Sequence, residues 1–306
     1  MVQTILVTGA AGSVGRIGHR VVELLLRRGF RVRAQVRSDD PRAAALRTLG
    51  AEVSVGDLLE LDALHRAIEE CERLYFGMSV SPSYLEAAVN MAAVAKHHEV
   101  KAFVNMSQMT VDEMDVHKTT SSPQQKQHWL AEQVLSWSGL PVVEVRPTAF
   151  MEGLFLQSAR GVARQGKLLV PFGAGKNSAI AASDVAKVIA EILSDPAPHI
   201  GKTYSLTGPV SQDMHAVAKA FSLALGRQID YVDVPLEQWT SMLSKLGIPP
   251  HVMSHLATMA RLHQDNRYDR YTDNVERLIG TRAIGVQTFV EDHAQSFAPA
   301  LSPDQV

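Results

Sequence analysis

The residues whose types and spacing indicate a chemical role most clearly form a glycine-rich turn near the start of the chain. The apolar run TILV leads directly into the turn TGAAGSVG, and an amphipathic segment follows. Glycines at this spacing let the backbone approach a pyrophosphate without a Cβ in the way and aim a helix N-terminus at its negative charge. The pattern predicts a dinucleotide-binding turn, and the alternative is a strand-to-helix turn that binds nothing.

The glycines of this turn have different expected tasks. Gly9 makes the turn, Gly12 permits close approach of the pyrophosphate, and Gly15 lets the helix pack on the strand. Gly18 follows three residues later, so either Gly15 or Gly18 can be the packing glycine. The expected pyrophosphate contacts are Thr8, Gly9, Ala11, Gly12, Ser13, Val14 and Gly15.

A residue that selects between NAD and NADP is expected roughly 20 residues beyond the glycines, at the end of the second strand. Arg37 occupies that place, with Arg33 four residues earlier, and no carboxylate stands at the strand end. A guanidinium binds a 2′-phosphate through two oxygens, so we expect NADP(H) to be preferred, with NAD(H) as the second candidate. The alternative is an Arg37 that is solvated or paired with Asp39 or Asp40.

Further cofactor contacts are expected where the next strands end. Asp57 follows the third predicted strand, where its carboxylate can accept a hydrogen bond from the adenine amino group or cap a helix. Ligands of open α/β folds bind at the carboxyl edge of the sheet, which continues after strands four and five. The expected contacts there are Leu58, Gly77, Met78, Ser79 and Ser107.

An alternation of β-rich runs and segments of helical period must position these residues. Six strands and five crossovers predict an α/β fold with a doubly wound parallel sheet of the Rossmann type. The predicted strands are 4–7, 32–36, 52–55, 74–76, 102–106 and 142–145, and the predicted helices are 16–28, 41–49, 62–70, 84–98 and 124–137.

The alternation weakens after Pro147. A helix around 150–160, a turn with Pro171, Gly173 and Gly175, a strand at 203–206 and a mostly helical remainder indicate a smaller substrate lobe. We expect a dinucleotide-binding domain over 1–150 to which 178–208 returns, a substrate lobe over 151–177 and 209–298, and a flexible tail over 299–306. The candidates for an apolar cleft that binds the substrate are Phe150, Met151, Phe155, Phe172 and Trp239. The alternative is that these side chains only pack in the core.

Composition restricts the partners. The net charge of −2 gives no broad positive field, so neither nucleic acid nor a membrane surface is an expected partner. No run approaches the roughly 20 apolar residues that span a bilayer, and a single cysteine together with a first strand close to Met1 favours a reducing cytoplasm without a leader. We expect a monomer or homodimer that binds a small, aromatic molecule.

Several motifs together carry a family resemblance: the TGxxGxxG turn, VRAQVR at 32–37, VGDL at 55–58, NMS at 105–107, and SGL at 138–140 leading to Arg146 and Pro147. Over residues 4–210 they resemble the NmrA-like group of atypical short-chain dehydrogenase/reductases, close to its bacterial quinone and triphenylmethane-dye reductases. The resemblance implies that Gly9, Gly12, Gly15, Arg37 and Asp57 serve the adenosine diphosphate. It places Ser107, His128, Pro147 and Thr148 toward the nicotinamide.

The resemblance departs from ordinary short-chain dehydrogenases at their Tyr-x-x-x-Lys pair. Gln124 and His128 stand at those positions, and Gln124 cannot act as an acid. His128 is therefore the candidate catalytic residue, as a proton donor or a hydrogen-bond donor to the nicotinamide ribose, and the alternative is a surface or helix-packing histidine.

Two functions of different classes follow. The first is an NADPH-dependent oxidoreductase that transfers hydride to a quinone-like, aromatic or conjugated molecule, because such acceptors need positioning more than a strong acid. The second is a non-catalytic dinucleotide-binding redox sensor, and an isomerase that uses its cofactor transiently is a third. No metal is expected, because the His251 and His255 pair lacks the glutamate of a zinc protease motif.

Overall fold

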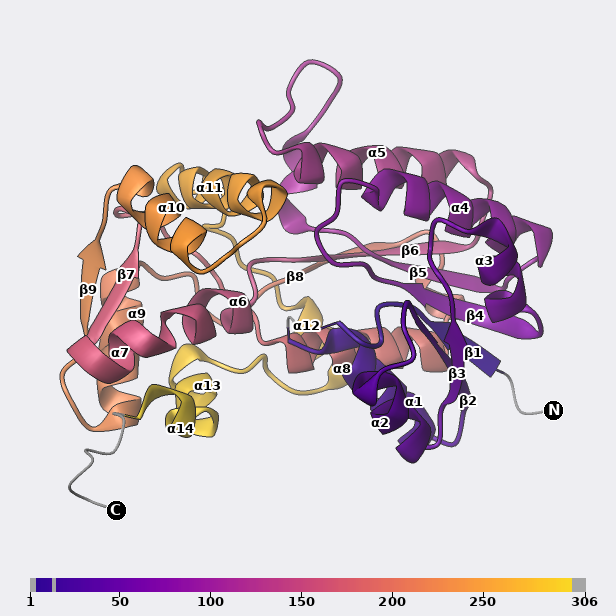
Figure 1. Cartoon of the computed structure of the whole chain (residues 1–306), viewed down its shortest axis with the longest axis horizontal. Coiled ribbons are helices and arrows are strands. Elements are labelled where there is room, and N and C mark those ends of the chain that lie inside the picture. The colour runs from indigo at the N-terminus through magenta and orange to yellow at the C-terminus, as the bar shows by residue number, and fades with distance from the viewer. Residues whose placement is uncertain (1–3, 13–14, 299–306) are drawn as a thin grey trace. The chain divides into compact units, whose positions relative to one another are not determined.

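The structure is a computed structural model that describes residues 4–12 and 15–298 (Figure 1). The chain divides into two compact units, each with its own core. The first unit comprises Met1–Pro147, Ala182–Leu206 and Asn274–Thr281, and the second comprises Thr148–Ala181, Thr207–Asp273 and Arg282–Val306.

The first unit is built on a parallel sheet of seven strands, which confirms the predicted doubly wound α/β fold. The strand order is β3-β2-β1-β4-β5-β6-β8, and every neighbouring pair is parallel. The seventh strand, β8, lies beside β6. The bounds are β1 (Thr4–Val7), β2 (Arg31–Val36), β3 (Glu52–Val55), β4 (Cys71–Phe76), β5 (Ala102–Met106), β6 (Val142–Pro147) and β8 (Thr203–Leu206).

Helices cover both faces of this sheet. In Figure 1, α3, α4 and α5 lie on one face, whereas α1 and α8 lie side by side on the other and α12 packs against α8. The helices are α1 (Ile17–Arg27), α2 (Pro41–Thr48), α3 (Leu61–Ile68), α4 (Tyr84–His97), α5 (Pro123–Trp137), α8 (Ala182–Ser194) and α12 (Asn274–Ile279), with short 3-10 turns at Met109–Glu113 and Ala197–His199.

Local signals explain where α2 begins. Asp40 is the N-cap, its Oδ1 accepts a hydrogen bond of 2.8 Å from the Arg42 amide, and Pro41 opens the helix. Proline suits this position because its missing N–H would have no partner in the first turn. The helix start predicted at residue 41 is confirmed.

The strand order creates a switch point in the sheet. The chain runs outward from β1 to β2 and β3 on one side, and from β4 to β5, β6 and β8 on the other. The connections that leave β1 and β4 therefore diverge and open a crevice at the carboxyl ends of these two strands. Ligands of doubly wound sheets bind at this place, and both the glycine turn and Gly77 lie there.

The second unit combines helices with a small parallel sheet of two strands, β7 (Lys167–Val170) and β9 (Asp230–Asp233). The sequence predicted mainly helices here and missed both strands, because β9 reads Asp-Tyr-Val-Asp and has a charged residue at each end. The predicted helix around 150–160 is broken at Leu156–Ser158 by a 3-10 turn. The helices are α6 (Met151–Phe155), α7 (Ala159–Gln165), α9 (Met214–Leu225), α10 (Leu236–Lys245), α11 (Pro250–Gln264), α13 (Val286–Asp292) and α14 (Ala294–Phe297).

In the described part of the chain, no helix combines the length and apolar character that crossing a membrane requires.

Candidate functional site

The glycine turn after β1 leaves no room for side chains at its key positions. Gly9 has a φ of 62°, and a Cβ on it would lie 2.5 Å from the Gly77 carbonyl oxygen. The Gly12 amide donates a 3.0 Å hydrogen bond to the Gly9 carbonyl and closes the turn. Ser13 and Val14, two of the predicted contacts, lie outside the described residues. The turn is the kind of narrow backbone cradle that a pyrophosphate needs.

Gly18, rather than Gly15, is the glycine that packs helix against strand. A Cβ on Gly18 would lie 2.6 Å from the Gly9 carbonyl oxygen and 2.9 Å from the Ala10 Cα. Gly15 and Arg16 instead have φ values of 59° and 51°, and α1 begins only after them. Spacing alone allowed both glycines, and the two left-handed residues before α1 decide between them.

Thr8 ties the two strands of the switch point together. Its hydroxyl donates a 3.0 Å hydrogen bond to the Gly77 carbonyl and accepts one of 2.9 Å from the Gly77 amide, and the whole residue is buried. The Thr8 amide also donates a 3.0 Å hydrogen bond to the Tyr75 carbonyl. Both donors of Thr8 are thus engaged with the protein, so the residue positions the turn and has no free donor for a ligand. Of the other predicted residues here, Met78 is half-buried and Ser79 is exposed.

Arg37 is exposed directly after the end of β2. Of the two alternatives predicted for Arg37, the pairing with Asp39 or Asp40 is wrong, because Asp39 pairs with Arg47 at 2.7 Å and Asp40 with Arg42 at 2.5 Å. A solvated Arg37 that binds no ligand stays an alternative. No side chain in the described parts of the chain pairs with the Arg37 guanidinium. It is available to an anionic ligand at the carboxyl edge of the sheet.

Arg42 is a feature of this edge that the sequence analysis missed. Its Nη1 donates a 3.1 Å hydrogen bond to the Ala11 carbonyl while the same guanidinium binds Asp40. The start of α2 is therefore attached to the glycine turn, beside the end of β2. Arg42 follows the helix cap in sequence, where a basic residue carries no special signal.

Arg33 has a structural role. It is buried, and it donates hydrogen bonds to the Glu52 carboxylate at 2.8 Å and to the carbonyls of Ala67 and Glu69 at 2.9 and 2.6 Å. These contacts join β2 to β3 and to the end of α3. Of the two arginines predicted on this strand, only Arg37 is free to contact a ligand.

Asp57 lies half-buried in the loop between β3 and α3. Its Oδ1 accepts a 3.0 Å hydrogen bond from the Leu59 amide, while Glu60 holds the N-cap position of α3. The carboxylate thus shapes the loop and is not the helix cap. Leu58 packs against the core of the first unit and supports the same loop.

The ends of β5 and β6 carry two buried hydroxyls that lack partners. Ser107 is held in place by its amide, which donates 2.8 Å to the Val145 carbonyl, but its Oγ has no hydrogen-bond partner among the described residues. Pro147 ends β6, and the hydroxyl of the following Thr148 is likewise buried and, within the described ranges, unpartnered. Buried polar atoms normally find partners, so these hydroxyls fit a bound polar ligand. Only Ser107 and Pro147 belong to the first unit.

His128 lies on α5 between two residues that fix its position. Its ring packs on the Tyr84 ring with centroids 3.9 Å apart, and its Nε2 lies 3.4 Å from the Gln124 amide nitrogen. Gln124 is itself held by its Oε1, which accepts 3.0 Å from the Ser81 amide. The half-buried imidazole is thus oriented, which either a catalytic or a packing role would require.

Tyr84 does not replace the missing tyrosine acid. It is fully buried, and its hydroxyl donates a 3.1 Å hydrogen bond to the Met106 carbonyl. Burial raises the pKa of Tyr84 well above its usual value, and the nearby Glu144 adds to the effect. Its proton is therefore held at every physiological pH.

Two carboxylates, Glu132 and Glu144, come from α5 and β6. Glu132 on α5 binds the Arg146 guanidinium through both oxygens, and Glu144 on β6 accepts a 2.7 Å hydrogen bond from the Asn105 side chain. Burial, followed by repulsion from Glu132, raises the pKa of Glu144 to about 8. Glu144 therefore carries its proton at neutral pH, a property that the alternating strand sequence did not reveal.

The proton on Glu144 makes stability depend on pH. Because the pKa is raised by folding, the group's favourable contribution is complete below the unfolded pKa and is lost as pH rises toward 8. We expect Glu144→Gln, which keeps an oxygen for Asn105, to gain about 4 kcal/mol in free energy of unfolding relative to the wild type between about pH 5 and pH 9, since each pKa unit corresponds to about 1.4 kcal/mol. Urea unfolding at both pH values measures this. The matched control is Glu72→Gln on an exposed position of β4, and a Glu144→Gln curve parallel to the wild type would contradict the assignment.

The second unit contains a mainly apolar cavity of about 160 Å³. Of the residues predicted to form an apolar cleft, Phe172 and Trp239 line it. Met151 and Phe155 instead lie in the hydrophobic core, and Phe150 precedes α6. Other lining residues are Leu154, Leu169, Met242, Leu243, Leu256 and Met259.

The seven-stranded parallel sheet with a glycine turn at its switch point defines a Rossmann-like fold. The chain belongs to the NmrA-like family, whose model matches residues 1–292. It is 30% identical to the NAD(P)H azoreductase of Xenophilus azovorans over 291 residues, which cover 94% of this chain and 98% of that protein.

Solved structures share the fold over nearly the whole chain. An NADPH-dependent quinone oxidoreductase of Escherichia coli in complex with NADPH has a TM-score of 0.83 at 24% identity, covering 95% of this chain and 99% of that one. NmrA, a negative transcriptional regulator in complex with NADP, has a TM-score of 0.79 at 18% identity, covering 95% of each chain. Enzymes and a regulator thus share this architecture.

Proposed function

We propose that the protein is an NADPH-dependent oxidoreductase that reduces quinone-like, azo or other conjugated aromatic molecules. The observation that carries the proposal is the kinship, over almost the entire length of both chains, with an NAD(P)H azoreductase. Named relatives that are reductases support an enzyme of this class. A cytoplasmic location and a monomeric or homodimeric state stay predictions.

The first unit supplies the residues that would hold NADP(H). The backbone from Gly9 to Gly12 would bind the pyrophosphate, and the exposed Arg37 would bind the 2′-phosphate. The unpaired state of Arg37 in the described chain supports a preference for NADP(H) over NAD(H). The contacts proposed in this unit for the adenine and nicotinamide ends are Asp57, Leu58, Gly77, Met78, Ser79, Ser107 and Pro147.

When bound, the nicotinamide supplies a hydride, which is two electrons and one proton. A quinone or azo acceptor also needs a second proton, from solvent or from a side chain. Gln124 cannot provide it, and the buried Tyr84 is bound to a carbonyl. His128 is the proposed donor of this proton or of a positioning hydrogen bond. The apolar cavity with Phe172 and Trp239 is the proposed surface for an aromatic substrate.

The role of His128 makes a kinetic prediction. We expect His128→Ala to lower kcat about tenfold to a hundredfold, in the range of lost acid catalysis, while the Kd for NADPH changes less than about threefold. Steady-state kinetics and calorimetry of the same preparation measure the two effects. The control is His215→Ala on α9, whose ring packs on Tyr231 in the second unit. An unchanged kcat would contradict the catalytic role of His128 and would mean that its ring only packs against its neighbours.

The proposed function is tested by following NADPH oxidation with a panel of quinones, azo dyes and conjugated enones. We expect turnover of at least one class, with one NADPH consumed for each quinone or enone reduced and two for each azo bond cleaved to two amines. If NADPH binds tightly and is never consumed, the reductase proposal fails, and the redox-sensor hypothesis takes its place. A sensor would have to bind the oxidised and reduced cofactors with different affinities.

A further inference from the structure

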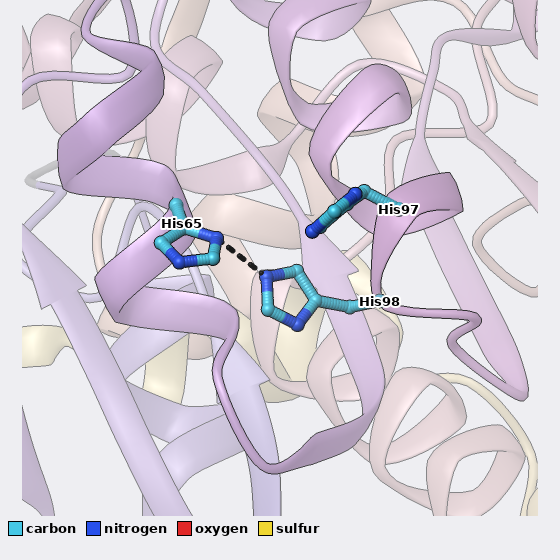
Figure 2. A group of neighbouring side chains, drawn as sticks. All are labelled: His65, His97 and His98. Atoms are coloured by element: carbon cyan, nitrogen blue, oxygen red, sulfur yellow. Dashed lines mark hydrogen bonds between the residues drawn. The ribbon is translucent and has the colours of Figure 1, made fainter.

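Three histidines gather on the surface of the first unit (Figure 2). His65 and His97 are exposed and His98 is half-buried, and one ring nitrogen from each lies within 4.8 Å of the other two. His98 Nε2 and His65 Nδ1 are 2.9 Å apart and share a hydrogen bond. The ring centroid of His98 lies 4.8 Å from that of His65 and 5.1 Å from that of His97.

The sheet topology explains why these side chains meet. His65 lies in the last turn of α3, His97 ends α4, and His98 is the C-cap residue of α4. Each helix follows a strand and runs antiparallel to it. The C-termini of both helices therefore lie near the amino ends of the parallel strands. The glycine turn and Arg37 are at the carboxyl edge, so the histidine cluster is separate from the proposed cofactor site.

The surroundings favour a cation. The C-terminal ends of α3 and α4 each carry a partial negative charge, which stabilises positive charge near the last turn. Glu69, just after α3, adds an attractive carboxylate near His98.

We propose that His65, His97 and His98 form a binding site for one Zn²⁺ ion, with water in the fourth position. Imidazole nitrogens are suited to this borderline ion. Zn–N bonds of about 2.0–2.1 Å in a tetrahedron hold the nitrogens about 3.4 Å apart. The observed spacings, from 2.9 Å up to 4.8 Å, lie on both sides of this value. Small side-chain rotations on the open surface suffice to close the site.

Binding of Zn²⁺ would replace the hydrogen bond between His65 and His98 with stronger metal–nitrogen bonds. In the hydrogen bond between His98 Nε2 and His65 Nδ1, one of the two nitrogens carries the proton. When the metal takes that place, the neutral ring carries its proton on its other nitrogen, so neither ring loses a proton to solvent. The ion would then connect the end of α3 to the end of α4 on the same face of the sheet. Its expected effect is therefore on the stability of the first unit and not on cofactor binding.

The test is calorimetric titration of the full chain with Zn²⁺ alone, after treatment with a chelator. We expect one ion per chain, and we expect His65→Gln and His98→Gln each to weaken binding at least about tenfold. The matched control is His251→Gln, an exposed histidine of the second unit, which should bind Zn²⁺ like the wild type. Zn²⁺ should also raise the Tm of the wild type by about 3 °C or more and leave that of His98→Gln unchanged.

X-ray absorption of the wild-type complex gives an answer that does not depend on any variant, with three imidazole nitrogens at about 2.0 Å expected. Absence of saturable binding would overturn the proposal. So would binding that survives both cluster substitutions, or binding that His251→Gln removes. Because none of these measurements uses NADPH or substrate, their outcome is independent of the reductase proposal.

Discussion

Replacing Gly18 with alanine is expected to weaken NADPH binding about tenfold to a hundredfold. The added Cβ would lie 2.6 Å from the Gly9 carbonyl oxygen and 2.8 Å from its carbon, which are backbone atoms that cannot rotate away. The turn must shift to admit it, and overpacking of this kind costs about 1–3 kcal/mol. Calorimetric titration of the variant with NADPH measures the loss.

The matched control is Gly153→Ala, also at a helical glycine, where a Cβ meets nothing within 4 Å. We expect this variant to bind NADPH like the wild type and to be slightly more stable, because alanine favours helix. Thermal unfolding of both variants separates a local shift of the turn from general destabilisation. A Gly18→Ala protein with wild-type affinity for NADPH would show that the pyrophosphate does not bind at this turn.

The second large effect is expected at Arg37. Arg37→Ala should lower the ratio of NADPH to NADH affinity about tenfold to a hundredfold, since a hydrogen bond to a charged group contributes about 1.5–3 kcal/mol. NADH affinity should hardly change, because NADH lacks the 2′-phosphate. Titrations of wild type and variant with both cofactors at one salt concentration give the two ratios.

Arg31→Ala is the matched control for this substitution. Arg31 and Arg37 are exposed arginines at opposite ends of β2, and only Arg37 stands at the carboxyl edge of the sheet. We expect Arg31→Ala to leave the affinity ratio unchanged. An equal loss in both variants would mean that general positive charge, rather than a phosphate contact, sets the preference.

Much of the sheet could be predicted because buried parallel strands appear in a sequence as short apolar runs between turn residues. The strands at 4–7, 52–55, 102–106 and 203–206 have the same bounds in the structure. The runs at 74–76 and 142–145 were too short by a few residues, because Glu72, Arg73 and Arg146 interrupt the apolar pattern. Charged residues at strand ends are where the pattern stops being informative.

Other features depend on contacts between distant residues and could not be read from local patterns. The ion pair of Arg33 with Glu52 and the raised pKa of Glu144 depend on which strands are neighbours. The histidine cluster joins His65 to a pair that lies one strand and one helix later, so its spacing matches no metal motif. The packing role of Gly18 depends on two left-handed residues that precede α1.

The central claim, that the glycine turn and Arg37 hold NADP(H), is tested most directly by calorimetric titration of the wild-type protein. NADPH and NADH are titrated in turn under identical salt conditions. The account predicts that both bind and that NADPH binds more than about tenfold tighter, a difference of about 1.4 kcal/mol. If neither cofactor binds, the turn is a scaffold alone, and equal or tighter binding of NADH would contradict the role of Arg37.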